Sequence, residues 1–136
     1  MNLLETKPLI RKIDSIEVRV PDLEAGLGFY RDKLGHELVW RNETAAGLRM
    51  SDTDAEIVMQ TERPPETALL VTSVEDAVSR VVAAGGKMVA EPHDIQIGRC
   101  GVVEDPWGNR LVLLDMSKGR LLTDANGRIV GNEPPS

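Results

Sequence analysis

Hydrophobic and polar residues follow one order twice along the chain: a strand, a helix and three further strands. In the first copy, residues 13–20 read IDSIEVRV, and Ile16, Val18 and Val20 alternate with polar residues, which predicts a strand with one apolar face. Asp22 can cap the helix that follows, and Gly35 is placed to end it. The apolar stripe of this helix is Leu23, Leu27, Tyr30 and Leu34. Three short strands are expected after it, over residues 37–40, 47–50 and 56–60.

The second copy repeats this order. An apolar strand over residues 68–71 precedes Ser73, which can cap a helix, with Asp76 at the capping-box position. A glycine pair at 85–86 ends the helix. The apolar stripe of this helix is Val74, Val78 and Val81. Three strands are again expected, over residues 87–90, 99–103 and 110–115.

The two copies superpose position by position. An offset of 51 residues pairs the first strands and the helices: Val20 with Val71, Leu27 with Val78, and Gly35 with Gly86. Past the second strand the offset becomes 54, which pairs Gly47 with Gly101 and Val58 with Val112. Agreement through a whole βαβββ order indicates a tandem duplication.

The duplication sets the expected domain organisation. One domain covers residues 12–117, with module one over about 12–62 and module two over about 65–117. Residues 118–136 lie outside the repeat, and Asn126-Gly127 between apolar runs predicts a hairpin there. We expect this hairpin to cover a sheet edge or a subunit interface.

The predicted fold class is α+β. Each module should form a four-stranded sheet with a helix on one face, and two such sheets side by side curve into an open cup with the helices outside. The strand faces opposite the helices should then carry the chemistry. By alternation these positions are Ser15, Glu17, Arg19, Glu56, Val58, Gln60, Val112 and Leu114.

Composition limits the class of partner. The net charge of −6 argues against nucleic acid or an anionic membrane, because both attract basic surfaces. Cys100 is the only cysteine, so no disulfide forms within the chain, and residues 1–8 do not resemble a signal peptide. No run of apolar residues is long enough to span a membrane. We therefore expect a cytoplasmic protein.

Two segments resemble the vicinal oxygen chelate superfamily, the group of glyoxalases, bleomycin-resistance proteins and extradiol dioxygenases. One is residues 16–35, IEVRVPDLEAGLGFYRDKLG, and the other is residues 103–113, VEDPWGNRLVL, which holds the D-P-x-G-N turn before the last strand. The resemblance implies paired βαβββ modules, an open cup and a homodimer that binds a small molecule.

Metal-using members of that family hold the ion through the first and last strands of each module. Residue by residue, these positions fall on Ser15, Val58, Glu66 and Val112. Valine has no donor atom, and one carboxylate with one hydroxyl does not make the three or four N or O donors that such a metal needs. The sequence therefore predicts no cofactor, and Ser15, Val58 and Val112 disfavour a divalent metal without excluding it.

Other side chains are candidates for ligand contact or catalysis. Glu66 and Glu17 are the best candidates for catalytic carboxylates, although strand-end charges are more often simply solvated. His93 stands in an expected loop before residue 99, and loops often carry function. The full set of expected ligand contacts is Ser15, Glu17, Arg19, Trp40, Arg49, Gln60, Glu66, His93, Arg99 and Val112.

The leading hypothesis is a metal-independent protein that binds a small organic molecule, similar to the bleomycin-resistance type. The alternative is an enzyme of the same superfamily, metal-dependent or metal-free: a lyase or isomerase of glyoxalase type, or a dioxygenase. A rearranged site of Glu17, Gln60, Glu66 and His93, or a metal-free acid–base pair, would then serve it. Fold resemblance alone does not choose between them.

Overall fold

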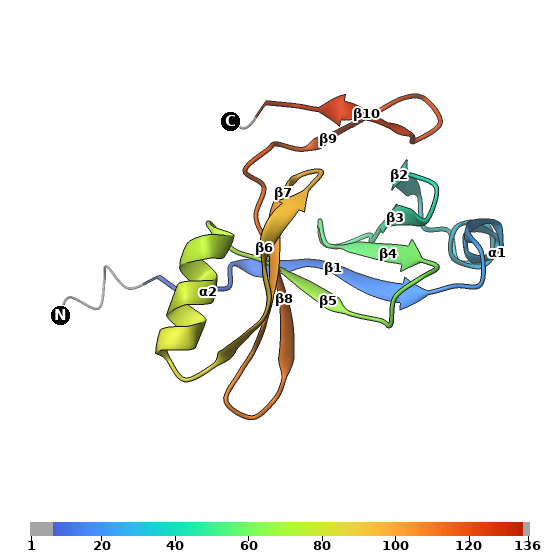
Figure 1. The fold of residues 1–136 in the computed structure, drawn as a ribbon. Helices are drawn as coiled ribbons and strands as arrows, with labels where there is room; N and C mark the ends of the chain where they lie inside the picture. Colours follow the sequence, from blue (N-terminus) through green and yellow to red (C-terminus); the bar gives the residue numbers. More distant parts are fainter. Residues whose placement is uncertain (1–6, 135–136) are drawn as a thin grey trace.

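One mixed sheet of eight strands runs through the whole molecule, with one helical segment on the outside of each half (Figure 1). The computed structural model describes residues 7–134. The strands of the sheet, in chain order, are β1 Lys12–Arg19, β2 Leu38–Arg41, β3 Ala45–Arg49, β4 Glu56–Gln60, β5 Thr67–Leu70, β6 Lys87–Ile95, β7 Gly98–Glu104 and β8 Arg110–Leu114.

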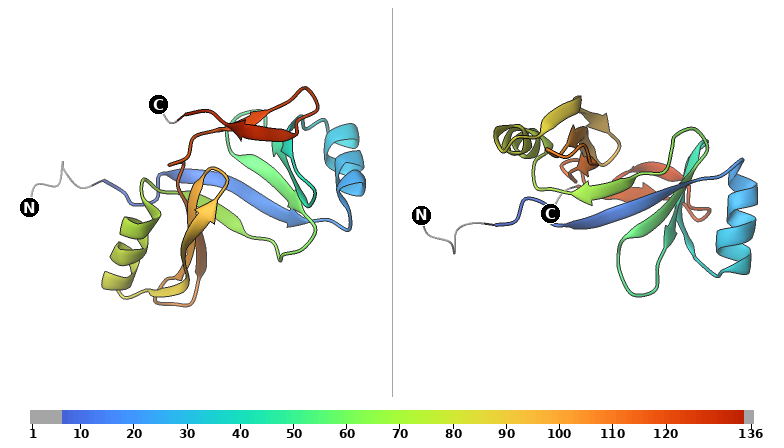
Figure 2. Two further views of the ribbon diagram at one scale, coloured as in Figure 1. Left: turned by 45° about the horizontal axis from the view of Figure 1, so that its top comes forward. Right: turned by 90° about the horizontal axis from the view of Figure 1, so that it is seen from below.

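The strand order β2-β3-β4-β1-β5-β8-β7-β6 places the two modules edge to edge. The central strands β1 and β5 are antiparallel, and each is parallel to the last strand of its own module, β4 or β8. Figure 2 shows the two ends of the sheet turned away from a common centre, with β2 and β6 as the outer edges. The predicted α+β fold with two βαβββ modules in an open sheet is confirmed.

The helices begin where the sequence predicts. The side chain of Asp22 accepts a hydrogen bond from the backbone N–H of Ala25 at 2.7 Å and starts α1, Leu23–Leu27. Ser73 starts α2, Val74–Ala83, in the same way. The first helix differs in its second half, because residues 28–33 continue as a wider π-helix. The wider turn takes Leu34 out of the predicted stripe and leaves it 53% exposed.

Matching apolar clusters join each helix to its half of the sheet. Both clusters contain side chains with no exposed surface, Met59 in module one and Leu113 in module two. The cluster under α1 is Val20, Leu23, Leu27, Ala46, Leu48 and Met59. The cluster under α2 is Val71, Val74, Ala77, Val78, Val103 and Leu113. The two helix faces are therefore built from equivalent positions.

The register of the third strands corrects one part of the predicted superposition. Gly47 pairs with Val58 in module one, whereas Val102, and not Gly101, pairs with Val112 in module two. Gly47 therefore corresponds to Val102, and the shared glycines were a misleading match. Each glycine has its own reason: Gly47 lies directly under the ring of Trp40, and a Cβ on Gly101 would come 3.1 Å from Val74 of α2.

Strand β6 is longer than the sequence predicts. Residues 87–90 were expected as a strand and His93 in a loop, but β6 continues to Ile95, and His93 pairs with Cys100 of β7. The reason is two irregularities in the β6–β7 register, which let the pairing pass Pro92.

The C-terminal hairpin joins the two far edges of the sheet. It consists of β9, Leu121–Thr123, and β10, Ile129–Asn132, and it lies above the sheet in Figure 1. At its tip, the backbone N–H of Arg41 in β2 donates to the carbonyl of Gly127 at 2.7 Å. At its base, the side-chain amide of Asn132 donates to the carbonyl of Gln96, between β6 and β7, at 2.9 Å. The hairpin thus covers part of the β2 edge.

No helix within residues 7–134 is both long and apolar enough to cross a membrane. Most of the N-terminal segment in which the sequence predicts no signal peptide, residues 1–6, lies outside the described residues, as do residues 135–136.

Candidate ligand-binding hollow

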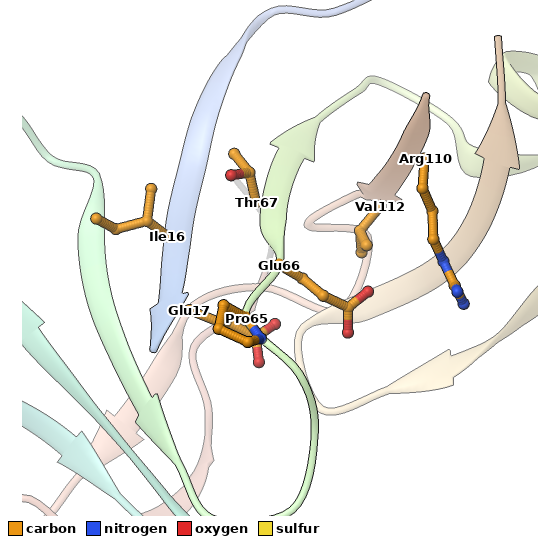
Figure 3. Close-up of a pocket in the computed structure, with 7 residues that line it drawn as sticks. All are labelled: Ile16, Glu17, Pro65, Glu66, Thr67, Arg110 and Val112. Carbon is orange, nitrogen blue, oxygen red and sulfur yellow. The ribbon is translucent and has the colours of Figure 1, made fainter. Parts of the chain in front are cut away.

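A shallow hollow of about 290 Å³ lies where β1, β5 and β8 meet at the centre of the sheet (Figure 3). It is lined by Ile16, Glu17, Pro65, Glu66, Thr67, Arg110 and Val112. The lining is mixed, with two carboxylates, one guanidinium and several apolar side chains. Such a mixture of apolar wall and few polar groups is typical of small-molecule sites.

The sheet register brings these side chains together from three strands. Glu17 lies opposite Val58 in β4, and its backbone N–H donates to the carbonyl of Glu66 at 2.7 Å. Val112 lies opposite Ala68, two residues after Glu66. In Figure 3 the side chain of Glu66 extends from the start of β5 toward Val112 and Arg110. Residues about 50 apart in the sequence therefore share one wall.

The loop before β5 carries a charged side chain, Arg63, to the carboxylates that line the hollow. The side chain of Gln60 accepts hydrogen bonds from the backbone N–H of Glu62 at 2.7 Å and of Arg63 at 2.6 Å, and it donates to the carbonyl of Arg63. This holds the loop so that Arg63 pairs with the carboxylate of Glu17 at 2.7 Å. Gln60 was predicted to contact ligand; it is only 2% exposed, and these bonds occupy it.

The charges of the site act on one another. The hydrogen bond that Arg63 donates to Glu17 raises the pKa of Arg63, so this guanidinium stays protonated. Burial raises the pKa of the Cys100 thiol, and the nearby carboxylates of Glu66 and Glu17 raise it further. Cys100 is therefore a protonated thiol at neutral pH, which does not favour it as a nucleophile.

The four positions that the resemblance assigns to metal ligands do not fit a metal. Ser15 is 4% exposed within β1, Val58 and Val112 fill the equivalent places in β4 and β8, and only Glu66 offers a carboxylate. One carboxylate and one buried hydroxyl are too few donors for a divalent cation. Within the part of the chain that the structure describes, no three His, Cys, Asp or Glu side chains are grouped to hold an ion.

Trp40 and Glu56 form a pair away from the hollow. The indole Nε1–H of Trp40 donates to Glu56 at 2.7 Å, and its ring covers Gly47. Burial raises the pKa of Glu56; the Trp40 hydrogen bond opposes this rise, and the carboxylate of Asp14 adds to it. Trp40, predicted as a ligand contact, instead packs on module one's own strands.

Several other predicted contacts lie outside the hollow. Arg99 pairs with Glu75 of α2 at 2.8 Å and with Asp94 at 3.3 Å. Arg49 pairs with Glu37 at 3.4 Å. The remaining side chains of this group, which do not line the hollow, are Ser15, Arg19 and His93. The rearranged constellation of Glu17, Gln60, Glu66 and His93 is therefore not brought together as a whole.

Three predicted residues do line the hollow: Glu17, Glu66 and Val112. Sequence reasoning missed Arg63 and Arg110. Arg63 stands in a loop outside the repeat, and no sequence signal ties it to Glu17. Arg110 had a signal, because the offset of 54 residues between β4 and β8 places it on Glu56, a position predicted to face the cup.

Comparison with known proteins identifies the family of the chain. Residues 12–113 match the sequence profile of the Glyoxalase/Bleomycin resistance protein/Dioxygenase superfamily. The chain belongs to this superfamily. The matched residues span both modules and leave out the C-terminal hairpin. No curated protein matches the chain in sequence.

Solved structures with the same superfamily fold include enzymes of different chemistry. Methylmalonyl-CoA epimerase from Mycobacterium tuberculosis is 20% identical, with a TM-score of 0.69 over 81% of this chain and 91% of that one. A hypothetical protein from Bacillus halodurans is 18% identical, with a TM-score of 0.67 over 83% and 98%. Homoprotocatechuate 2,3-dioxygenase from Brevibacterium fuscum is 22% identical, with a TM-score of 0.58 over 80% and 37%. At these identities the likeness extends to the fold alone.

Proposed function

We propose that this superfamily member binds a small organic molecule in the hollow without the metal that its enzymatic relatives use, as a bleomycin-resistance type of protein does. The observation that carries the proposal is the pair Val58 and Val112. They fill equivalent places in β4 and β8, where the resemblance expects donors, and their repeat symmetry argues against a misalignment in one module.

The hollow supports the same proposal. Its volume of about 290 Å³ is at the small end of ligand sites, which favours a molecule of metabolite size. One of its two carboxylates is already partly neutralised, since Arg63 pairs with Glu17 at 2.7 Å. A carboxylate that is already paired with a guanidinium is a weaker metal ligand, because the pairing takes up part of its charge and of its lone pairs.

Isothermal titration with zinc, nickel, manganese and iron(II) tests the absence of the metal. We expect no stoichiometric binding tighter than micromolar by the purified protein. Tight one-to-one binding that the variant Glu66→Gln abolishes would refute the proposal, because it would show that the retained carboxylate still holds an ion.

The enzyme alternative has one observation in its favour: the Glu66 carboxylate extends into the hollow, where it could act as a general base (Figure 3). The epimerase likeness supplies a probe. Methylmalonyl-CoA incubated with the protein in heavy water would exchange its α-hydrogen if such a base reached it, and proton NMR would follow the exchange. The binding proposal predicts no exchange above background. Exchange that is lost in Glu66→Gln, with an unchanged folded spectrum, would establish an enzyme instead.

We also propose a homodimer. Ile13 pairs with Leu69, which packs against the cluster under α2, so it stands on an apolar strip on the helix side of β1, and it is 48% exposed. A second copy of the chain would cover this strip. Light scattering behind size-exclusion chromatography should give twice the monomer mass, and Ile13→Glu should return the protein to a monomer. A monomeric wild-type protein would remove this part of the proposal.

A further inference from the structure

The four charged side chains at the hollow are not equally satisfied. Arg63 lies 2.7 Å from the carboxylate of Glu17, whose side chain is only 12% exposed, so these two charges already neutralise each other. Arg63 reaches Glu66 only at 4.0 Å, the limit of an ion pair. Arg110 has no carboxylate within ion-pair distance anywhere in residues 7–134. Glu66 and Arg110 are therefore the two ends with capacity left for a ligand.

The nearest competitor for Arg110 along the sheet is Glu104. The two residues are direct partners in the β7–β8 register, so their side chains share a face. They nevertheless form no ion pair. In Figure 3 the side chain of Arg110 extends beside Val112 rather than back across it.

The hollow offers both signs of charge. Figure 3 shows the Glu66 carboxylate next to Val112 and the Arg110 side chain beside both, and Val112 is apolar and 9% exposed. A short molecule that lies in the hollow against Val112 can therefore reach a negative group and a positive group at the same time. A guanidinium binds carboxylates with two parallel hydrogen bonds, and a carboxylate accepts from ammonium or hydroxyl groups.

We infer that the ligand is a short zwitterion of the amino-acid type. Its carboxylate pairs with Arg110, its ammonium group donates to Glu66, and a short hydrocarbon segment lies on Val112. This inference rests on the proposed function and names the ligand class of the same hollow. A large cationic antibiotic does not suit it, because the hollow measures about 290 Å³ and presents a positive charge at one end.

Three probes of equal chain length separate the charge patterns: 4-aminobutyrate with one charge of each sign, succinate with two negative charges and 1,4-diaminobutane with two positive charges. Titration followed by amide NMR should shift residues 66–67 and 110–112 with 4-aminobutyrate. We expect the other two probes to bind at least about tenfold more weakly. Succinate would place a negative group against Glu66, and 1,4-diaminobutane would place a positive group against Arg110.

Two variants locate the contacts. Arg110→Gln and Glu66→Gln should each weaken 4-aminobutyrate binding by about tenfold or more, the size expected for one charge-assisted contact. Arg80→Gln, on the outer surface of α2, removes the same charge elsewhere and should leave the titration unchanged.

Specific results would contradict the inference. Tighter binding of 1,4-diaminobutane than of 4-aminobutyrate, an Arg110→Gln titration equal to wild type, or no shift at the hollow with any probe would each refute it. These results are distinct from failure of the metal-free proposal, which only the metal titration or the hydrogen-exchange assay reveals.

Discussion

The helix faces of the two modules are alike, while their cup faces have diverged. On the helix side, Met59 corresponds to Leu113, Leu48 corresponds to Val103, and all four side chains are fully buried. On the cup side, a polar residue in module one can stand at the position that an apolar residue occupies in module two. Gln60 corresponds to Leu114, which belongs to a third apolar cluster with Val102 and Val112. Packing against a helix constrains both copies equally, whereas the cup face is free to change with function.

Charge also reverses between the two cup faces. The cross-strand pair Arg49 and Glu56 in module one becomes Glu104 and Arg110 in module two. The reversal puts a guanidinium at the edge of the hollow, where an unmodified repeat would put a carboxylate. The asymmetry between the two modules therefore generates the mixed charge of the candidate site.

The largest expected effect tests the equivalence of the helix faces. Met59→Ala and Leu113→Ala each remove a side chain with no exposed surface, and each should lower the free energy of unfolding by about 3 kcal/mol. Chemical denaturation measures both. A difference of more than about 2 kcal/mol between the two variants would mean that the two cores do not carry equal shares of the stability.

Asp115 is a feature of module two alone. Its carboxylate accepts hydrogen bonds from the backbone N–H of Val74 at 3.1 Å and of Arg99 at 3.0 Å, and from the hydroxyl of Ser117 at 2.7 Å. Burial alone would raise the pKa of Asp115, but the bonds from Ser117, Val74 and Arg99 outweigh it and hold this pKa below its usual range. The carboxylate thus fastens the start of α2 to the end of β8.

Asp115→Asn should therefore cost about 2 kcal/mol of unfolding free energy at pH 7. A carboxyl whose pKa is lower in the folded than in the unfolded state stabilises the fold at pH values above the unfolded pKa. This contribution to the free energy of unfolding is lost as the pH falls through the folded pKa. The gap between wild type and variant should therefore shrink below about pH 4. Thermal melts at pH 7 and pH 3 measure it. Thr61→Ala, at the equivalent position of module one, is the control and should cost little; a gap independent of pH would contradict the account.

Glycines at the third strands separate the two modules further. Gly47→Ala places a methyl group against the Trp40 ring and should displace it from Glu56, at a cost of about 1–2 kcal/mol. In Gly101→Ala the tightest contact of the new methyl group is with Val74 at 3.1 Å, followed by Val78 at 3.4 Å, and the change should cost less than about 1 kcal/mol. Tryptophan emission should shift in the first variant only. An unshifted spectrum in Gly47→Ala would show that the ring accommodates the methyl group in place.

The smallest effect concerns Glu56, the counterpart of Arg110. Because burial raises its pKa, the ionised form weakens the fold, and this penalty grows as pH rises from the unfolded pKa, about 4.3, toward the folded one. Glu56→Gln keeps an acceptor for the indole N–H of Trp40 and removes the charge. It should raise the free energy of unfolding at pH 7 by only about 0.5 kcal/mol, because solvent screens a partly exposed charge. The gain should vanish near pH 4 in matched denaturation curves. A loss of stability at both pH values would show that the charge itself is needed.

The sequence predicted the architecture well because two independent signals, apolar alternation in the strands and capping residues at the helix ends, occur twice in the same order. Glu17 was singled out from alternation, Glu66 from the family resemblance and the repeat, and Val112 from both; all three line the hollow. It could not predict the Arg63 contact, which depends on how Gln60 folds a non-repeated loop.

The misplacements have equally specific causes. Gly47 and Gly101 were paired because residue identity matched, although strand register did not. Arg99 was expected near the ligand because it stands on a strand of module two, but Glu75 of α2 and Asp94 hold its side chain elsewhere. Both errors concern side-chain partners from distant segments, which local pattern does not encode.

The C-terminal hairpin has a consequence for the behaviour of the protein at high concentration. An open sheet has two edge strands whose free N–H and C=O groups can pair with another chain, and such edges promote aggregation. The carbonyl of Gly127 already accepts from Arg41 on the β2 edge, and Asn132 holds the turn beside the β6 edge. The hairpin therefore protects the sheet from edge-to-edge pairing with other chains. A shortened hairpin should lower the solubility of the protein before it lowers its stability.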